Sequence, residues 1–280
     1  IAFLQTQAYL ATGNRKYLDR AAREMCLYLG RLQRPNGLFF HAEDVPFVWG
    51  RGCGWMAAAM PMILKYLPDD SPQREPILSA YRKTMATLLA HQRASGLWGQ
   101  IVDDGSSWDE TSGSAMFAYA FNEGAKHGWI DRATYSAAAR KAYDALVAKL
   151  DAEGNLADVC TGTGAFNSRE HYLNRPRVNG DPHGQAALAW LCRSLMEKED
   201  ARPRQVRRGM GAAALAHPTR PVHARDRSPQ LRGGVLPPHG HAREARLQRE
   251  ERAGAGLRRG TEGDVRPCVR GQRQLDPSRL

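Results

Sequence analysis

The C-terminal part of the chain lacks the residues from which protein cores are built. Residues 201–280 contain no Phe, Trp, Tyr, Ile, Asn or Lys. Their remaining apolar residues follow neither the 3.6-residue period of a helix nor the two-residue period of a strand. A segment of this composition does not bury a core. We therefore expect residues 201–280 to form a disordered tail, separate from a folded domain of residues 1–200.

The charge of the chain is also confined to this tail. Residues 201–280 hold 18 Arg against 7 acidic residues, whereas residues 1–200 are neutral, so the formal charge of +11 belongs to the tail alone. An evolved nucleic-acid-binding arm usually mixes Lys with Arg and either clusters the charge or interleaves aromatic residues for stacking. The tail does none of these. Its Arg/Gly/Pro/Ala mixture favours translation out of frame from GC-rich DNA, and we expect no nucleic-acid partner.

Long apolar runs and paired cysteines are missing as well. No run approaches the roughly 18 residues needed to span a bilayer, so no membrane partner is expected. The five cysteines lack the CxxC or Cys/His spacing of zinc and redox sites, and we expect neither a metal nor a cofactor. They do not distinguish a cytoplasmic from a periplasmic or secreted protein. The chain opens without Met inside an apolar helical pattern, which predicts that the natural protein begins earlier.

Residues 1–200 contain an internal repeat. Gly37, Gly96 and Gly154 are spaced by 59 and 58 residues, and Trp49 and Trp108 differ by 59. Each of the three glycines follows a helix with apolar residues on one face and precedes a short loop. After each loop comes a segment of small apolar residues, "WMAAAMPMILKYL", "TSGSAMFAYAF" and "HGQAALAWLCRSLM". A helix that is apolar on every side is buried on every side. The repeat is therefore an outer helix, a loop and an inner helix.

Helical hairpins of this kind predict an all-α fold in which an inner ring of helices is wrapped by an outer ring. Closing six hairpins into an (α/α)6 barrel would take about 350 residues at this spacing. Three complete hairpins and the end of an earlier one precede residue 200. We therefore expect an incomplete (α/α)6 barrel.

The loops of the three repeats should gather at one end of the toroid, because each runs from an outer helix to an inner one. Carboxylates and tryptophans at the mouth of such a barrel suggest a carbohydrate site, where indole rings stack on sugars and carboxylates transfer protons. The polar and aromatic candidates in the loops are His41, Glu43, Asp44, Trp49, Arg51, Trp98, Gln100, Asp103, Asp104, Trp108, Asp109, Glu110, Asp158, Arg175, Asp181 and His183.

Several candidates have a structural alternative. Asp44 lies too far before the helix that begins near Trp49 to be a normal N-cap, which favours a functional role. Asp109 and Glu110 precede an inner helix, where an acidic residue also stabilises the helix dipole. Arg51 lies between glycines and could hold an anionic sugar or pair with Glu43.

The candidate histidines and tryptophans also have either a structural or a ligand-binding role. His41 is equally suited to a loop contact or a substrate contact. In "DPHGQ", Asp181 is a candidate N-cap, and His183 either belongs to that cap or faces a ligand. Trp55 is expected in the core, whereas Trp49 and Trp98 are the candidates for stacking on a sugar.

Three sequence blocks resemble a known enzyme family. They are "HAEDVPFVWGRGCGW", "LWGQIVDDGSSWDETSGSAMFAYAF" and "CTGTGAFNSREHYLNRPRVNGDPHGQAALAW". Together they are similar to the unsaturated rhamnogalacturonyl hydrolases of glycoside hydrolase family 105 and, more distantly, to the unsaturated glucuronyl hydrolases. The resemblance covers nearly all of residues 1–200 and none of residues 201–280.

The resemblance implies a six-hairpin barrel, no metal, and an oligosaccharide substrate that ends in a 4,5-unsaturated uronic acid. It also implies that Asp44, just before the W-x-R-G motif, is the general acid and base. A further aspartate of the family belongs to a segment before residue 1, so this chain is expected to be weakly active or inactive alone. We assign substrate binding to His41, Trp49, Arg51, Trp98, Gln100 and His183.

For Asp44 to hold its proton near neutral pH, we expect it to lie in a dry pocket with Glu43 and the aromatic side chains of Phe39, Phe40, Phe47 and Trp49. Two other functions fit the residues. One is a glycosidase that uses Asp44 and Glu110 as paired carboxylates. The other is a non-catalytic interaction protein, either a helical scaffold or an Arg-rich nucleic-acid binder.

Overall fold

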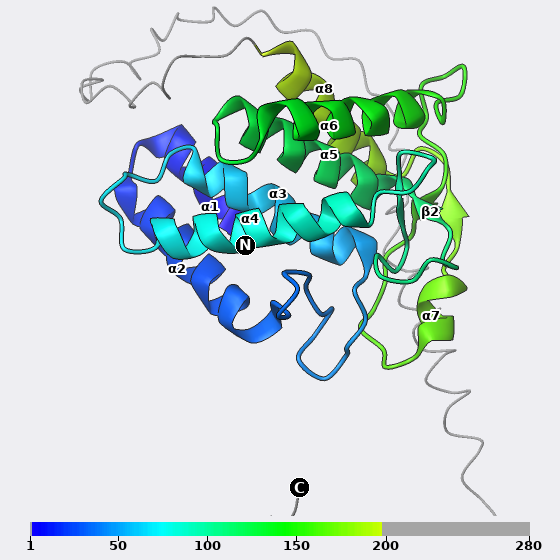
Figure 1. The fold of residues 1–280 in the computed structure, drawn as a ribbon, viewed down its shortest axis with the longest axis horizontal. Helices are drawn as coiled ribbons and strands as arrows, with labels where there is room; N and C mark the ends of the chain where they lie inside the picture. Colours follow the sequence, from blue (N-terminus) through cyan, green and yellow to red (C-terminus); the bar gives the residue numbers. More distant parts are fainter. Residues whose placement is uncertain (1, 198–280) are drawn as a thin grey trace, which may run out of the picture. The chain divides into compact units, whose positions relative to one another are not determined.

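The computed structural model describes residues 2–197, which form a succession of antiparallel helical hairpins (Figure 1). The predicted disordered or out-of-frame tail, residues 201–280, lies outside the described residues. The helices are α1 (Ala2–Thr12), α2 (Arg15–Leu32), α3 (Gly50–Leu64), α4 (Arg74–Ala90), α5 (Thr111–Lys126), α6 (Arg132–Val147), the short α7 (Arg169–Leu173) and α8 (Pro182–Met196).

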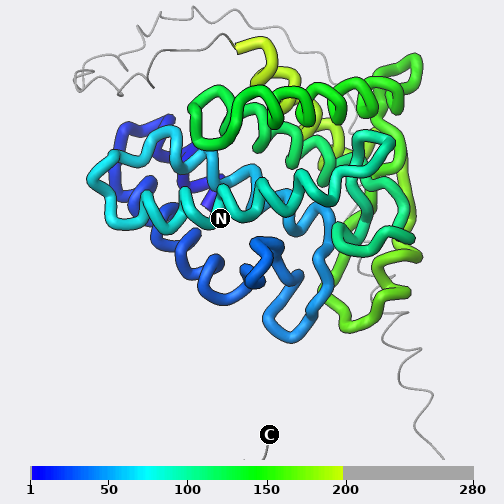
Figure 2. The backbone as a smooth tube through the Cα atoms, in the orientation of Figure 1, coloured from blue at the N-terminus to red at the C-terminus, as the bar shows by residue number. Residues whose placement is uncertain are grey.

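The helices occupy two layers, as the tube in Figure 2 shows. In the inner layer, α3 packs on α5 and α5 packs on α8. In the outer layer, α2 packs on α4, while α6 lies against α5. Helix α1 contacts both α2 and α3. The predicted all-α, partial α/α toroid with outer and inner helices is confirmed.

Burial differs among the inner helices. Every residue of α5 from Thr111 to Ala125 is buried, as its small apolar sequence predicts. Helix α8 was also expected to be buried on every side, but only one face of it is covered, and Met196 is 82% exposed. The reason is that α5 is the one helix of residues 2–197 with an extensive contact to α8.

Trp55 is a second departure from the expected core. Its side chain is 38% exposed, although aromatic residues of two other helices pack against it. Its ring lies edge-on to Phe3 of α1, at 6.4 Å between ring centroids, and to Trp190 of α8, at 5.8 Å. The prediction that Trp55 lies in the core is therefore wrong.

The repeat glycines share one conformation. Gly37, Gly96 and Gly154 have φ angles of +90°, +89° and +82°, a region that L side chains rarely adopt. A Cβ atom at Gly37 would lie 2.8 Å from the carbonyl carbon of Lys83, and one at Gly96 would lie 2.8 Å from the carbonyl oxygen of Lys141. The two glycines therefore bring the chain into equivalent contacts with the next outer helix, which explains their regular spacing.

Two glutamines, one in each of two successive repeats, form equivalent hydrogen bonds beside these glycines. Gln33 Nε2 donates to the carbonyl oxygens of Gly37 and Ala80, and Gln92 Nε2 donates to those of Gly96 and Ala138. Each amide thus ties the end of one outer helix to the middle of the next. These hydrogen bonds hold successive hairpins in register, so that their loops reach the same end of the structure.

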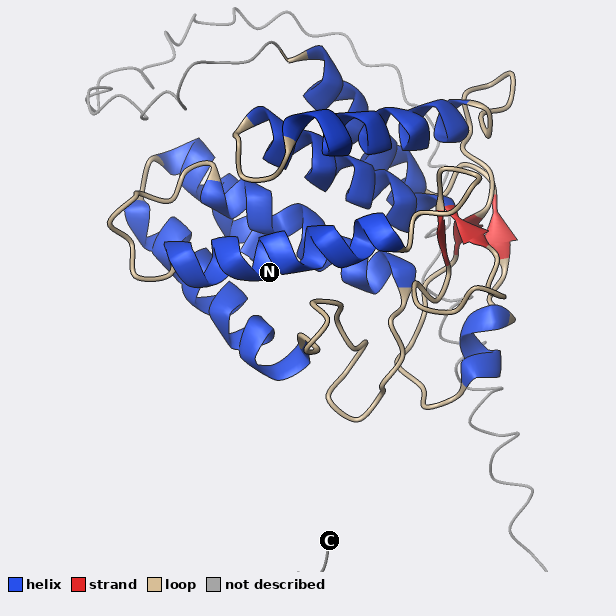
Figure 3. Ribbon diagram, viewed as in Figure 1, coloured by secondary structure: helices blue, strands red, loops and turns tan. Residues whose placement is uncertain are grey.

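Short strands stiffen these loops (Figure 3). β1 (Trp98–Gly99) pairs antiparallel with β2 (Asp109–Glu110), and β3 (Val159–Cys160) pairs antiparallel with β4 (Arg177–Val178). Within residues 2–197, no helix combines the length and apolar character required to cross a membrane.

Candidate active site at the loop end of the inner helices

The three loops that follow the repeat glycines meet at one end of the inner helices, as predicted. The N–H of Gly50, where the first loop enters α3, donates to the carbonyl oxygen of Gln100 in the second loop at 2.8 Å. The N–H of Thr111, after the second loop, donates to the carbonyl oxygen of Asp158 in the third at 3.3 Å. The loops therefore form one connected surface above α3, α5 and α8.

An apolar cluster lies at the centre of this surface. It contains side chains from all three loops, and we call it the loop cluster: Val45, Phe47, Trp49, Ile101, Tyr172 and Leu173. The His41 ring packs against it, with its centroid 4.7 Å from the Trp49 ring and 5.6 Å from the Tyr172 ring. The cluster thus places one imidazole and one indole side by side.

His41 is bound to the cluster by a hydrogen bond as well as by packing. Its Nδ1 atom lies 2.6 Å from the Tyr172 hydroxyl oxygen. Burial, together with the charges of the nearby His171 and Arg51, lowers the pKa of His41 to about 4. His41 is therefore neutral at physiological pH and can donate or accept a hydrogen bond there.

Trp49 carries a polar atom that the folded chain leaves without a partner. The residue is 8% exposed, and its indole Nε1 is buried with no acceptor among residues 2–197. Buried donors are nearly always hydrogen-bonded, so an unpartnered one calls for an acceptor from outside the described residues, such as a water molecule or a ligand. The guanidinium carbon of Arg51 lies 4.7 Å from the Trp49 ring centroid, which adds positive charge to the same region.

Arg51 itself is 1% exposed, which differs from the open anion clamp that its flanking glycines suggest. Its Nη1 donates to the carbonyl oxygen of Cys160 at 2.5 Å, and its Nη2 donates to that of Thr161 at 2.9 Å. Nη1 also donates to Ser112 Oγ at 3.3 Å. No carboxylate in the described part of the chain forms an ion pair with it. The guanidinium therefore fastens α3 to β3, and a ligand in the site would experience mainly its charge.

Trp98 is not a stacking face. It is 0% exposed, and its Nε1 donates to the carbonyl oxygen of Leu88 at 2.7 Å. Phe117 and Phe121 of α5 pack edge-to-face against its ring, at 5.3 and 5.6 Å between centroids. The prediction that Trp98 stacks on a sugar is therefore wrong, because core side chains cover its indole ring.

Gln100 is likewise 0% exposed, so it supports the loops from beneath. Its Nε2 donates to Cys160 Sγ at 3.0 Å and to the carbonyl oxygen of Tyr172 at 3.2 Å. Its Oε1 is buried without a donor among the described residues. Burial, together with the charge of Glu110, raises the pKa of the Cys160 thiol, which stays protonated beside this amide.

Glu110 is the N-cap of α5, which agrees with the structural role at a helix start that its sequence position allows. Its carboxylate accepts hydrogen bonds from the N–H groups of Ser112 at 3.1 Å, Gly113 at 2.6 Å and Cys160 at 3.1 Å. Asp109 forms an ion pair with Arg93 at 2.8 Å. Because backbone donors occupy both Glu110 oxygens, the geometry does not favour a glycosidase that pairs Glu110 with Asp44.

Asp44 lies in an exposed turn rather than in the expected dry pocket. The turn is closed by a hydrogen bond from the Val45 N–H to the carbonyl oxygen of Ala42 at 3.1 Å. Its neighbour Glu43 forms an ion pair with Arg31 at 3.0 Å. Within residues 2–197 the Asp44 carboxylate has neither a hydrogen-bond donor nor an ion-pair partner. The short turn projects Asp44 outward, while Val45 enters the loop cluster.

His183 forms its hydrogen bonds with Asp181 and is not a member of the loop cluster. Asp181 caps α8 by accepting a hydrogen bond from the His183 N–H at 2.9 Å, and the His183 Nδ1 lies 2.7 Å from the same oxygen. The His183 side chain is 46% exposed. The cap alternative is confirmed for Asp181, and a ligand contact of His183 stays a prediction.

Tyr172 is the site residue that the sequence reasoning missed. It is fully buried, at the end of the short helix α7, and lies 131 residues from its partner His41. The local signal was Ser168, whose side chain caps the helical segment "REHYL" and so indicates an ordered loop. No sequence pattern indicates that the tyrosine would meet the first loop.

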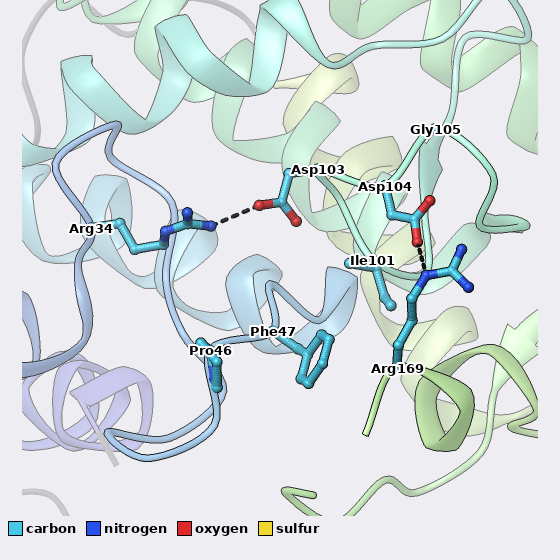
Figure 4. Close-up of a pocket in the computed structure, with 8 residues that line it drawn as sticks. All are labelled: Arg34, Pro46, Phe47, Ile101, Asp103, Asp104, Gly105 and Arg169. Carbon is cyan, nitrogen blue, oxygen red and sulfur yellow. Dashed lines mark hydrogen bonds and ion pairs between the residues drawn. The ribbon is translucent and has the colours of Figure 1, made fainter. Parts of the chain in front are cut away.

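A cavity of about 500 Å³ opens next to the loop cluster, with Phe47 and Ile101 on its wall (Figure 4). Ion pairs flank it on two sides: Arg34 with Asp103 at 2.7 Å, and Arg169 with Asp104 at 2.6 Å. The hydrogen bonds from Arg169 and Ser106 lower the pKa of Asp104 to about 2. The remaining lining residues are Pro46 and Gly105. No group of three or more potential metal ligands occurs in the described part of the chain.

The sequence of this chain is similar to those of several known proteins. The chain is 30% identical over 210 residues to the 24.9 kDa protein in the picA locus of Rhizobium radiobacter, covering 63% of this chain and 90% of that protein. It is 28% identical over 193 residues to the unsaturated rhamnogalacturonyl hydrolase YesR of Bacillus subtilis, covering 65% of this chain and 54% of that enzyme.

A solved structure shows the same fold. The crystal structure of a possible GH105 family member from Salmonella enterica serovar Paratyphi A superposes with a TM-score of 0.63 and 27% identity, over 69% of this chain and 53% of that one. The chain thus spans about half the length of this protein and of YesR. The model of Glycosyl Hydrolase Family 88 matches residues 2–198. The chain belongs to this family.

Proposed function

We propose that this chain forms part of a hydrolase that acts on oligosaccharides ending in a 4,5-unsaturated uronic acid. The family and the relative named an unsaturated rhamnogalacturonyl hydrolase support this proposal. The observation that carries it is the buried Trp49 N–H without an acceptor, next to the Arg51 charge. Such a pair suits an oxygen-rich anionic ligand such as a uronate.

The reaction requires one acid and one water. The C4–C5 double bond of the substrate is part of a vinyl ether, so a proton added to C4 generates an oxocarbenium ion at C5. Water adds to C5 and gives up a proton to the carboxylate that the first step ionised. The resulting hemiketal opens to a ketone at C5 and a hemiacetal at C1. The hemiacetal collapses to an aldehyde and expels the aglycone as an alcohol, which takes up the hemiacetal proton.

In this proposal His41 and Trp49 contact the uronate, and Arg51 supplies a fixed positive charge behind them. Main-chain oxygens of Cys160 and Thr161 hold Arg51, and the Tyr172 hydroxyl holds His41. A site held in this way loses little entropy when substrate binds. The cavity beside Phe47 is the place that we propose for the rest of the oligosaccharide.

Asp44 is the proposed general acid on the strength of the family resemblance. Its exposed turn does not supply the dry surroundings that such an acid needs. The proposal therefore requires substrate to cover the carboxyl group when it binds across the first loop. This requirement separates the role of Asp44 from those of His41 and Trp49, which are packed in place before substrate arrives.

The function is tested by following the loss of ultraviolet absorbance of an unsaturated rhamnogalacturonan disaccharide. We expect slow turnover by the parent chain, none by Asp44→Asn, and parental turnover by Glu43→Gln, which alters the adjacent exposed carboxylate. Activity of Asp44→Asn within a few fold of the parent would remove Asp44 from the mechanism. Release of product from a saturated glycoside, with none from the unsaturated one, would overturn the proposed reaction.

A further inference from the structure

The hydroxyl of Tyr172 meets two groups, a nitrogen of His41 and the backbone N–H of Phe166, and the N–H can only donate to the hydroxyl oxygen. The hydroxyl oxygen lies 2.6 Å from His41 Nδ1, and Tyr172 is 0% exposed. A neutral imidazole carries a proton on one nitrogen and a lone pair on the other. The direction of the hydrogen bond with His41 therefore decides which His41 nitrogen carries the proton.

Only one direction satisfies both groups. If Tyr172 donates to Nδ1, its hydroxyl hydrogen has an acceptor and the His41 proton lies on Nε2. If His41 donates from Nδ1, the buried hydroxyl hydrogen has no acceptor within residues 2–197, which native structures avoid. Burial also raises the pKa of Tyr172, so the phenol keeps its proton and can act as the donor.

We infer that Tyr172 is a positioning residue that holds His41 in the neutral tautomer protonated on Nε2. The ring orientation is fixed at the same time, because Trp49 packs on His41 at 4.7 Å between centroids. No group among the described residues binds Nε2. The Nε2–H is thus a free donor within residues 2–197, on a side chain that is partly exposed.

The consequence for the site depends on the proposed function. His41 Nε2–H and the unpartnered Trp49 Nε1–H come from rings whose centroids lie 4.7 Å apart, so this part of the site carries two neutral N–H donors. This arrangement selects a carboxylate or another acceptor group of the ligand. It disfavours a ligand group that can only donate, because two donors would then face each other.

The inference is tested by nitrogen NMR of the full-length chain labelled with ¹⁵N-histidine, with His41 assigned by the loss of its signals in His41→Gln. At pH 7 we expect a bare Nδ1 and a protonated Nε2 in the parent. In Tyr172→Phe, which keeps the packing, we expect exchange between the two tautomers. Tyr81→Phe is the matched control, because it also removes a buried tyrosine hydroxyl, whose acceptor is the Ala120 carbonyl oxygen.

A protonated Nδ1 in the parent, or an unchanged His41 spectrum in Tyr172→Phe, would overturn the inference. Kinetics provide a second readout if the parent chain turns over substrate. In Tyr172→Phe, kcat/KM should fall about tenfold, which is the effect of one lost hydrogen bond. In Tyr81→Phe, kcat/KM should equal that of the parent. The expected tautomer in a chain that does not bind an unsaturated disaccharide would contradict the proposed function while leaving the role of Tyr172 intact.

Discussion

Arg51 Nη2 donates to the carbonyl oxygen of Thr161 at 2.9 Å and so joins the start of helix α3 to a loop 110 residues later. With the second hydrogen bond to the Cys160 carbonyl oxygen, the guanidinium links the first and third loops beneath the His41–Tyr172 contact. Both carbonyl groups would be left without this donor if the side chain were shortened or changed in shape.

We expect Arg51→Lys to lower the free energy of unfolding by about 2–3 kcal/mol, because an ammonium group cannot reach both carbonyl oxygens. Urea denaturation followed by circular dichroism measures this change. Arg140→Lys is the control, since its exposed pair with Asp144 contributes little. Equal midpoints for Arg51→Lys and the parent would show that the guanidinium has no structural role.

Substitution of Trp98 should mainly lower stability, whereas substitution of Trp49 should mainly weaken substrate binding. Trp98→Phe removes a buried hydrogen bond and leaves a cavity against Phe117, so it should lower the free energy of unfolding by about 1–3 kcal/mol. Trp49→Phe keeps most of the packing and removes an N–H that has no partner, so it should cost less stability but weaken substrate binding. Denaturation and titration with an unsaturated disaccharide measure the two effects.

The opposite result is also informative. If Trp98→Phe weakens ligand binding at unchanged stability, the indole reaches the ligand through a rearrangement of the core. If Trp49→Phe binds as the parent does, the unpartnered indole N–H is not a ligand contact, and the proposed function loses the observation that carries it.

The fold could be predicted from the sequence because its signals are local and repeated. The spacing of Gly37, Gly96 and Gly154 reflects one positive-φ turn used three times. The small apolar composition of residues 111–125 likewise reports the complete burial of α5. Signals of this kind depend on backbone conformation and helix periodicity, which a sequence displays directly.

The site was less predictable because side-chain orientation within loops depends on distant partners. Trp49 and Trp98 look alike in the sequence, yet one contacts His41 in the loop cluster and the other packs under α5. Tyr172 becomes a site residue only through a contact across 131 residues. Asp44 turns outward because its neighbour Val45 is the residue that the cluster buries.

Substitution of Glu110 distinguishes a helix cap from a catalytic acid. Glu110→Gln keeps the shape but places an NH₂ group near the N–H of Gly113 or Ser112, so we expect the free energy of unfolding to fall by about 1–2 kcal/mol. Asp109→Asn should change it less, because the ion pair with Arg93 is partly exposed. A Glu110→Gln variant that keeps parental stability and loses all turnover would instead support the paired-carboxylate glycosidase.

The pH dependence of stability should contain a contribution from His41. Its pKa is about 4 in the folded chain and about 6.5 when unfolded, so between these values the unfolded state binds more protons. Stability should therefore rise as pH increases from about 4 to 6.5, and the contribution should be complete above that range. His41→Gln, which cannot titrate, should flatten this part of the profile, whereas Tyr81→Phe should keep its slope. Urea midpoints at half-unit pH intervals measure the effect, and identical slopes for His41→Gln and the parent would show that His41 titrates alike in both states.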